Sequence, residues 1–264
     1  MDYMARALQL ASRALGSVSP NPAVGAVLVR DGKIVGEGAT QPPGEAHAEI
    51  VALRAAGPLA RGSTLYVTLE PCAHYGRTPP CADAIVKAGV AEVHVAMLDP
   101  SPWVDGHGIV VLEEAGIRVH RGSHEAPAKR LNEAYLCWLT RGRPLVTAIY
   151  AFGLGGQQVP LDADELGASA QTELTRLRAT ADRTVTDVGT LLVEDPTLAG
   201  LAALGVTALH VEAPPHELED LKARGLLDRV VVLLAPTLAV GLEYERLGDA
   251  LLVRGSVADQ DPST

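Results

Sequence analysis

Residues 68–85 read TLEPCAHYGRTPPCADAI, and they follow the triplet His47-Ala48-Glu49 further up the chain. Together the two stretches hold one imidazole, one carboxylate and two thiols. A catalytic zinc ion takes three protein ligands and keeps a fourth position open for water. One imidazole and two thiolates meet that requirement, so we predict that His47, Cys72 and Cys81 bind zinc. Glu49 stays outside the ligand set, because a fourth protein ligand would close the open position.

Glu49 is the predicted proton shuttle. Zinc lowers the pKa of bound water to about 7, which makes hydroxide available at neutral pH. We expect Glu49 to accept that proton and deliver it to a ring nitrogen while the hydroxide attacks the carbon that carries an amino group. Zinc deaminases of nucleobases use this chemistry, with the pattern His-x-Glu followed by Pro-Cys-x-x-Cys. The reaction predicted for this chain is therefore the hydrolytic release of ammonia.

The spacing of the two cysteines departs from that pattern, because eight residues separate them in place of two. We expect this inserted loop to bulge away from the metal, return to it and hold substrate. Arg77 offers a planar guanidinium suited to phosphate. His74, Tyr75 and Thr78 add hydrogen-bonding groups.

The order of apolar segments predicts a helix, a hairpin and then repeated helix–strand units. Asp31-Gly32 is the expected hairpin turn, and Gly16 and Gly89 are expected to end helices. This order predicts an α/β fold with a mixed sheet. The expected helices are 4–15, 45–56, 79–88, 108–115 and 125–139, and the expected strands are 23–30, 33–38, 63–69, 91–98 and 117–120.

A domain boundary is predicted near residue 143, within Arg141-Gly142-Arg143-Pro144. We therefore expect a zinc-dependent deaminase domain over 1–143 and a second domain over 144–264. In the second domain we expect a helix at 166–180 and strands at 145–151, 183–187, 206–212 and 229–235.

Composition narrows the class of protein. The net charge is −10 and no run of Lys and Arg is present, which argues against a nucleic-acid partner. No basic N-terminal region leads into an apolar stretch, and no apolar run of about 18 residues occurs, so we expect no signal peptide and no membrane span. Three cysteines favour metal or catalytic use, and Cys137, in an apolar helix, is expected in the core. These features predict a cytoplasmic enzyme with a small-molecule substrate.

The quoted motifs resemble the deaminase domain of the bifunctional riboflavin biosynthesis deaminase/reductase family. The resemblance covers 1–143, includes the eight-residue cysteine spacing, and extends to residues 21–27 (NPAVGAV) and 96–100 (AMLDP). It implies a cytidine-deaminase-like mixed sheet with helices on both faces, followed here by a truncated dihydrofolate-reductase-like α/β domain. The implied substrate is a diaminopyrimidinone that carries a ribosylamino 5′-phosphate. The implied substrate-binding residues are Asn21, Thr40, His74, Arg77, Asp99 and Ser101.

Two of these positions depart from the family pattern. Thr40 stands where the family often has His, and Ser101 stands where it often has Asn. Both changes shorten a side chain that faces the substrate, and both leave the reaction type intact.

The second half resembles the family's reductase domain less closely. Ile149, Gly153 and Gly155 stand where the family has Lys, Ser and Asp. Asp187 replaces a glycine of the stretch that binds the phosphate of the cofactor, and residues 212–215 (EAPP) lack the glycines of Glu-Gly-Gly-Pro. We therefore expect no cofactor-binding residues there, and NADPH only if the domain is functional. Its expected role is structural, either covering the deaminase or forming an interface in a homo-oligomer.

Three alternatives remain open at this stage. The chain could be a bifunctional enzyme with a working NADPH-dependent reductase, or a deaminase of a related small ring in another pathway. It could also be a non-catalytic protein that zinc stabilises for assembly. An enzyme that edits polynucleotides is the least favoured, because the chain is acidic.

Overall fold

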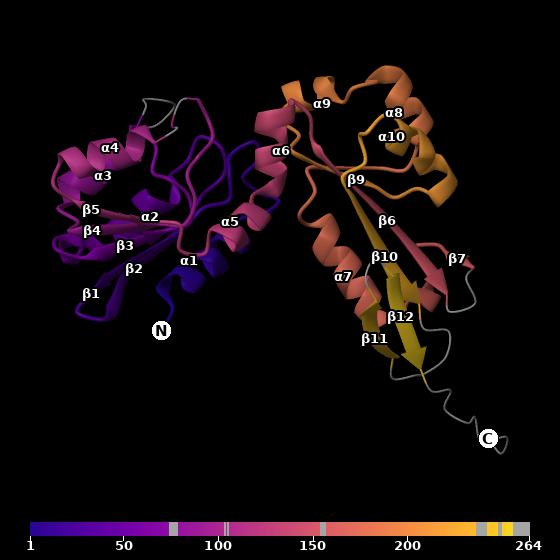
Figure 1. The fold of residues 1–264 in the computed structure, drawn as a ribbon, viewed down its shortest axis with the longest axis horizontal. Coiled ribbons are helices and arrows are strands. Elements are labelled where there is room, and N and C mark those ends of the chain that lie inside the picture. The colour runs from indigo at the N-terminus through magenta and orange to yellow at the C-terminus, as the bar shows by residue number, and fades with distance from the viewer. Residues whose placement is uncertain are drawn as a thin grey trace, which may run out of the picture. The chain divides into compact units, whose positions relative to one another are not determined.

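The computed structural model describes residues 1–73, 79–102, 104, 106–153, 157–235, 242–247 and 250–255. The chain divides into two compact units (Figure 1). The first unit consists of Met1–Leu145, Ala179–Arg183 and Leu192–Leu209, and the remaining segments form the second. The first unit thus takes in two segments from beyond residue 143, so the domain boundary proposed there stays a prediction.

The first unit is built around a five-stranded mixed sheet, in the order β2-β1-β3-β4-β5. β1 pairs antiparallel with both β2 and β3, whereas β3, β4 and β5 run parallel. This arrangement confirms the predicted mixed sheet. The strands are β1 (Gly25–Arg30), β2 (Lys33–Ala39), β3 (Thr64–Val67), β4 (Glu92–Val95) and β5 (Arg118–Arg121).

Helices cover both faces of this sheet, as predicted (Figure 1). On one side α2 contacts α3, and α3 contacts α4; on the other side α1 contacts α5. Apolar residues of the strands and of these helices form a single core cluster. The elements are α1 (Tyr3–Ser12), α2 (Ala48–Ala56), the 3₁₀ helix η1 (Gly57–Ala60), α3 (Cys81–Ala88), α4 (His107–Glu114), α5 (Glu125–Leu131) and α6 (Glu133–Arg141).

Helix α2 lies unusually close to strand β2. A Cβ atom added at Gly38 would lie 2.3 Å from the carbonyl oxygen of Ala48 and 2.7 Å from the nitrogen of Ala52. Both alanines are fully buried. The helix can approach because Gly38 has no side chain and the helix presents the small residues Ala48 and Ala52. Since α2 begins directly after His47, this packing also sets the position of His47 and Glu49.

The single helix predicted over 125–139 is wrong, because the structure contains α5 and α6 in its place. Asn132 separates them, with φ −100° and ψ 20°. Its side chain accepts a hydrogen bond from the Ala23 N–H at 2.9 Å and donates one to the Ala23 carbonyl at 3.0 Å. A buried amide that pairs with a distant backbone N–H and C=O in this way stabilises the break, because buried backbone groups need hydrogen-bond partners.

A second sheet is built from strands after residue 144, in the order β10-β6-β9-β8, with β7 paired to β6. The four strands predicted there are confirmed as β6 (Leu145–Gly153), β8 (Arg183–Val185), β9 (Ala208–Val211) and β10 (Arg229–Ala235), and the predicted helix as α7 (Ala168–Arg178). The sequence analysis missed β7 (Gln158–Val159), η2 (Asp164–Leu166), α8 (Val188–Glu194), α9 (Ala199–Ala203), η3 (Pro215–Leu218), α10 (Glu219–Ala223) and the paired strands β11 (Leu242–Leu247) and β12 (Ala250–Gly255). Among the described residues, no helix has the length and apolar character needed to cross a membrane.

The contact between α2 and β2 generates a stability prediction. Gly38→Ala places a methyl group against the helix backbone, so we expect it to lower the free energy of unfolding by about 1–3 kcal/mol. Chemical denaturation of the full chain, followed by circular dichroism, measures this change. Gly189→Ala is the matched control, because a Cβ there meets its nearest neighbouring atom at 3.5 Å. An unfolding midpoint for Gly38→Ala equal to that of the parent would contradict the close packing.

Candidate metal centre

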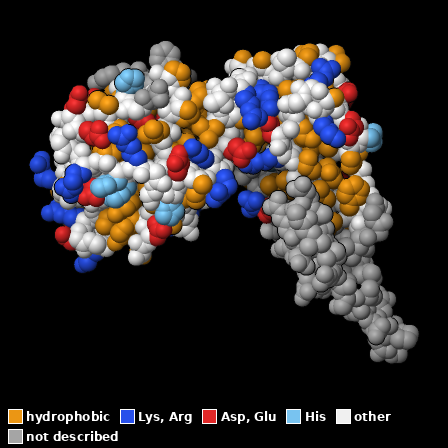
Figure 2. Space-filling view, in the orientation of Figure 1, with side chains coloured by type: hydrophobic (Ala, Val, Ile, Leu, Met, Phe, Trp, Pro, Cys, Tyr) orange, Lys and Arg blue, Asp and Glu red, His pale blue; other side chains and the backbone are white. Residues whose placement is uncertain are grey.

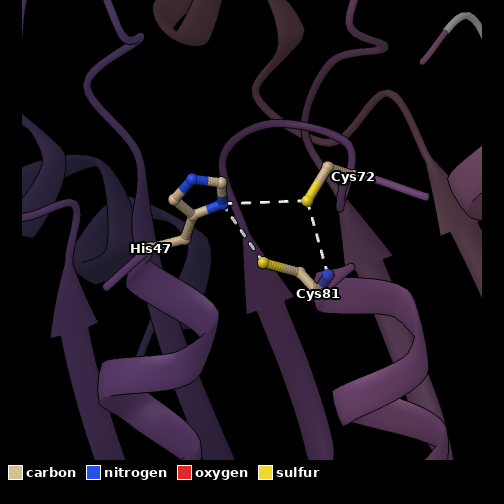
Figure 3. A group of neighbouring side chains, drawn as sticks. All are labelled: His47, Cys72 and Cys81. Atoms are coloured by element: carbon tan, nitrogen blue, oxygen red, sulfur yellow. Dashed lines mark hydrogen bonds between the residues drawn. The ribbon is translucent and has the colours of Figure 1, made fainter. Parts of the chain in front are cut away.

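The imidazole of His47 and the two thiols of Cys72 and Cys81 point toward one another (Figure 3). His47 is the residue directly before α2, Cys72 lies in the segment after β3, and Cys81 is the first residue of α3. His47 Nδ1 lies 3.7 Å from Cys72 Sγ and 3.3 Å from Cys81 Sγ. The backbone N–H of Cys81 donates to Cys72 Sγ at 3.3 Å. The structure therefore brings the three predicted ligands together.

These distances fit a tetrahedral zinc ion. Bond lengths of about 2.3 Å to sulfur and about 2.1 Å to nitrogen separate a nitrogen and a sulfur ligand by about 3.6 Å. The two observed separations, 3.3 and 3.7 Å, bracket that value. The donor set is also appropriate, because thiolate sulfur and imidazole nitrogen are the ligands that zinc prefers. The side chains can thus close around zinc with only small adjustments.

The thiols of Cys72 and Cys81 have opposite pKa shifts. Hydrogen bonding from the Cys81 thiol, assisted by His47 and the Cys81 N–H, lowers the pKa of Cys72 to about 4. The hydrogen bond to Cys72 and burial raise the pKa of Cys81. The start of α3 adds partial positive charge, which stabilises a thiolate. Cys72 is therefore ready to bind a cation as a thiolate, and binding would displace the proton of Cys81.

Glu49 lies in the first turn of α2 and is buried, with 4% of its surface exposed. Burial, followed by the nearby charge of Cys72, raises the pKa of its carboxyl to about 7. It lines the same cavity as His47 and Cys72. A carboxyl placed there can exchange a proton with a molecule held in the cavity near neutral pH.

The cavity beside these residues has a volume of about 470 Å³. It is large enough for a small ring with a substituent, since ligand pockets span about 300–1,000 Å³. The structure places four of the predicted substrate-binding residues on its wall: Asn21, Thr40, Asp99 and Ser101. The other two, His74 and Arg77, lie outside the described residues.

Two of the wall residues have polar groups already engaged by the protein. The Thr40 hydroxyl accepts from the Val24 N–H at 3.2 Å and lies 3.4 Å from the Val24 carbonyl, to which it donates. The carboxylate of Asp99 accepts from the Ser101 N–H at 3.0 Å. The Thr40 hydroxyl therefore bonds to the protein backbone, and the Ser101 N–H holds the Asp99 carboxylate in one orientation.

Sequence analysis missed Tyr135 and Trp138, which line the cavity from α6. The Tyr135 hydroxyl donates to Asp99 Oδ1 at 3.0 Å. Burial and the charge of Asp99 raise the pKa of Tyr135, so the hydroxyl stays protonated and available as a donor. No local motif marks these residues. They reach the cavity because the chain turns at Asn132, and nothing in the neighbouring sequence predicts that turn.

Glu70 is a further residue that the motif analysis passed over. It is buried, and its carboxylate accepts from the backbone N–H groups of Gly106 at 3.1 Å and Gly108 at 3.0 Å, with longer contacts to those of Asp99 and Ile109 at 3.4 Å. These bonds fix the loop that carries Asp99 and the start of α4. The sequence signal that could have identified Glu70 is its position directly before Pro71-Cys72.

Gly108 allows α4 to reach the segment that carries Cys72. A Cβ at Gly108 would lie 1.8 Å from the carbonyl oxygen of Pro71. A side chain there would push α4 away from the residue next to a metal ligand. Cys137, the third cysteine, is buried, as predicted.

Known proteins resemble this chain over both of its halves. Residues 1–97 match the family model for the cytidine and deoxycytidylate deaminase zinc-binding region. Riboflavin biosynthesis protein RibD of Escherichia coli is 45% identical over 199 residues, which is 74% of this chain and 54% of that protein. The diaminohydroxyphosphoribosylamino-pyrimidine deaminase of Buchnera aphidicola is 46% identical over 142 residues, which is 54% of this chain and 97% of that protein.

Among solved structures, RibD of Acinetobacter baumannii superposes with a TM-score of 0.75 at 30% identity, covering 96% of this chain and 97% of that chain. The likeness confirms the predicted cytidine-deaminase-like sheet followed by a second α/β part. The chain spans about half the length of the curated relatives that it matches first, 54–56% of each. With its zinc-type ligand set in place, the chain belongs to the riboflavin biosynthesis deaminase/reductase family.

Proposed function

We propose that this protein is a zinc-dependent hydrolytic deaminase of a phosphoribosylamino-pyrimidine. The observation that carries the proposal is the convergence of His47, Cys72 and Cys81 beside buried Glu49, at a cavity large enough for a substituted ring. Zinc supplies a water molecule that ionises near neutral pH. The overall reaction consumes water, replaces a ring amino group with a carbonyl and releases ammonia.

Glu49 has the proton-transfer role in this proposal. Its carboxyl is buried beside the ligand set, where the pKa of about 7 lets it alternate between its two protonation states. In the proposed cycle it takes a proton from the attacking water and passes it to the ring nitrogen. It then takes the proton of the newly formed hydroxyl group and delivers it to the leaving amine, so that the ring carbonyl forms as ammonia departs. A base of this kind contributes about 10²–10⁴ to the rate.

Asn21 and Asp99 are proposed to orient the ring. Both line the cavity, and Asp99 is fixed by Tyr135 and by the Ser101 N–H. A fixed carboxylate suits the recognition of amino or hydroxyl groups on a substrate, since it accepts hydrogen bonds without having to reorganise. Arg77 is proposed to contact the phosphate, on the basis of its guanidinium and its place in the loop between the cysteines. The names of the relatives support a pyrimidine substrate of the riboflavin pathway.

We further propose that the second half has no reductase activity. Ile149 is fully buried in an apolar cluster, where a Lys is the family's usual residue. Asp187 accepts from the Thr190 N–H and hydroxyl, both at 2.8 Å, at the start of α8. A carboxylate there occupies donors that a cofactor phosphate would need, and its charge repels phosphate. Glu212 forms an ion pair with Arg178. Residues 144–264 are proposed to serve a structural role, in a homo-oligomer.

Two other functions compete with this proposal. A bifunctional enzyme is favoured by the likeness to RibD chains. A deaminase of a related ring is favoured by Ser101 and by Thr40, whose hydroxyl bonds to Val24 where the family often has His. Ammonia release from a panel of amino-pyrimidines and amino-purines, with and without the ribosyl phosphate, separates the substrates.

Loss of one ligand tests the metal centre. Cys81→Ser is expected to reduce bound zinc from one equivalent per chain to well below half, and to abolish ammonia release with it. Elemental analysis of the purified full chain measures the zinc. Cys137→Ser is the matched control, because Cys137 is also buried but lies outside the ligand group. Equal zinc in the Cys81 variant and the parent would rule out the assigned ligand set.

Glu49→Gln separates the metal from the proton shuttle. We expect the variant to keep its zinc and to release ammonia about 10²–10⁴ times more slowly, because the amide cannot carry the proton. Zinc content and ammonia release are measured on the same preparation. Glu114→Gln, on the exposed side of α4, serves as the control. Unchanged zinc together with unchanged ammonia release would favour a non-catalytic zinc protein.

The second half is tested with NADPH. With the deaminated product as substrate, we expect no oxidation of NADPH above the rate without protein, followed by absorbance at the nicotinamide band. A RibD chain with both activities is the positive control. Sustained turnover would establish the bifunctional alternative and leave the deaminase proposal untouched.

A further inference from the structure

A second cluster of metal-ligating side chains lies on the parallel strands β4 and β5. Glu92 and His94 are two residues apart on β4, so their side chains lie on the same face of the sheet. His120 is the register partner of His94 on β5, and Arg118 is the partner of Glu92. The sheet therefore places two imidazoles and one carboxylate on neighbouring positions of one face.

The ligand atoms of this cluster lie close together. His94 Nε2 lies 2.9 Å from Glu92 Oε1, and His120 Nε2 lies 3.2 Å from the same oxygen. All three ligand atoms lie within 4.8 Å of one another. Ligands about 2.1 Å from a metal ion at right angles are separated by about 3.0 Å, so the observed distances match a shared coordination sphere.

The surroundings hold two of the three ligands in place. The His94 ring stacks on the Tyr66 ring, with 4.6 Å between centroids. Arg118 donates to Glu92 Oε2 at 2.7 Å, which leaves Oε1 directed at the imidazoles. Outer partners of this kind orient metal ligands. Glu92 and His94 are about one-fifth exposed, whereas the side chain of His120 is 53% exposed.

We propose that Glu92, His94 and His120 form a second metal site, for a divalent transition metal ion, on the face of the sheet that carries Tyr66. Two imidazole nitrogens and one carboxylate oxygen suit Zn²⁺, Ni²⁺, Co²⁺ or Cu²⁺, with water in the remaining positions. The ion would link β4 to the edge strand β5. Figure 2 shows histidine side chains at the surface of the first unit, beside charged ones, so an ion can reach such groups from solvent.

One ring must turn for the ion to bind. The His94 and His120 rings are stacked, with centroids 4.5 Å apart and 16° between their planes. Parallel rings cannot both direct a lone pair at one ion that lies between them. His120 is the ring that turns, because it is half exposed and lies on the last strand of the sheet. His94 keeps its place against Tyr66.

Titration of the full chain with Ni²⁺ tests the site. The first centre is filled beforehand with one equivalent of zinc per chain and unbound ions are removed, so that a further binding step reports binding at a second site. Calorimetry is expected to show one equivalent of Ni²⁺ bound, and elemental analysis is expected to show that the zinc remains. His120→Gln is expected to weaken this step at least about tenfold. Ni²⁺ is expected to raise the unfolding temperature of the parent but not that of the variant.

Two further variants complete the test. Glu92→Gln is expected to weaken Ni²⁺ binding in the same way as His120→Gln, and His216→Gln, an exposed histidine outside both clusters, is expected to leave it unchanged. Circular dichroism and the zinc content of the first centre show that each variant is folded. The proposal is overturned if the parent binds no Ni²⁺ beyond its zinc. It is equally overturned if His120→Gln and Glu92→Gln bind Ni²⁺ as the parent does.

Discussion

The starts of helices α2 and α3 lie next to each other, and the metal centre depends on this arrangement (Figure 3). His47 precedes α2 and Cys81 opens α3, so both ligands lie at helix starts, while Cys72 follows β3 and accepts the Cys81 N–H. Free N–H groups and partial positive charge at a helix start stabilise sulfur anions. The close packing at Gly38 holds α2 against the sheet and so fixes the start of this helix, directly after His47.

One wall of the cavity depends on polar side chains that bond to distant parts of the chain. Asn132 binds Ala23 and ends α5, and Tyr135, within one turn, reaches Asp99. Glu70 accepts several backbone N–H groups from the loop after Asp99. Burying such a group without a hydrogen-bond partner costs free energy, and the bond removes most of that cost. Each bond therefore fixes one segment relative to another. These bonds hold Asp99 and Tyr135 in place on the wall.

Much of the chemistry could be predicted from the sequence, because the ligands are set by residue type and short spacing. His47 and Glu49 are two residues apart, and each cysteine follows a proline at a predicted element boundary. The mixed sheet followed from the hairpin and the repeated helix–strand order. Tyr135 could not be predicted, because it reaches the cavity only after the chain breaks at Asn132. That break comes from a contact with Ala23, over a hundred positions away, which no local pattern records.

The two metal-ligating clusters differ in the softness of their ligands and in their burial. The first offers two thiol sulfurs, one of them fully buried, and soft ligands of that kind hold zinc firmly. The second offers nitrogen and oxygen only, on β4 and the edge strand β5 with His120 half exposed, and Arg118 keeps positive charge next to its carboxylate. Positive charge beside a ligand opposes a cation, so binding there is weaker and responds to the supply of metal. A chain that carries both clusters would fill the buried one first, and the exposed one would exchange its ion with solvent.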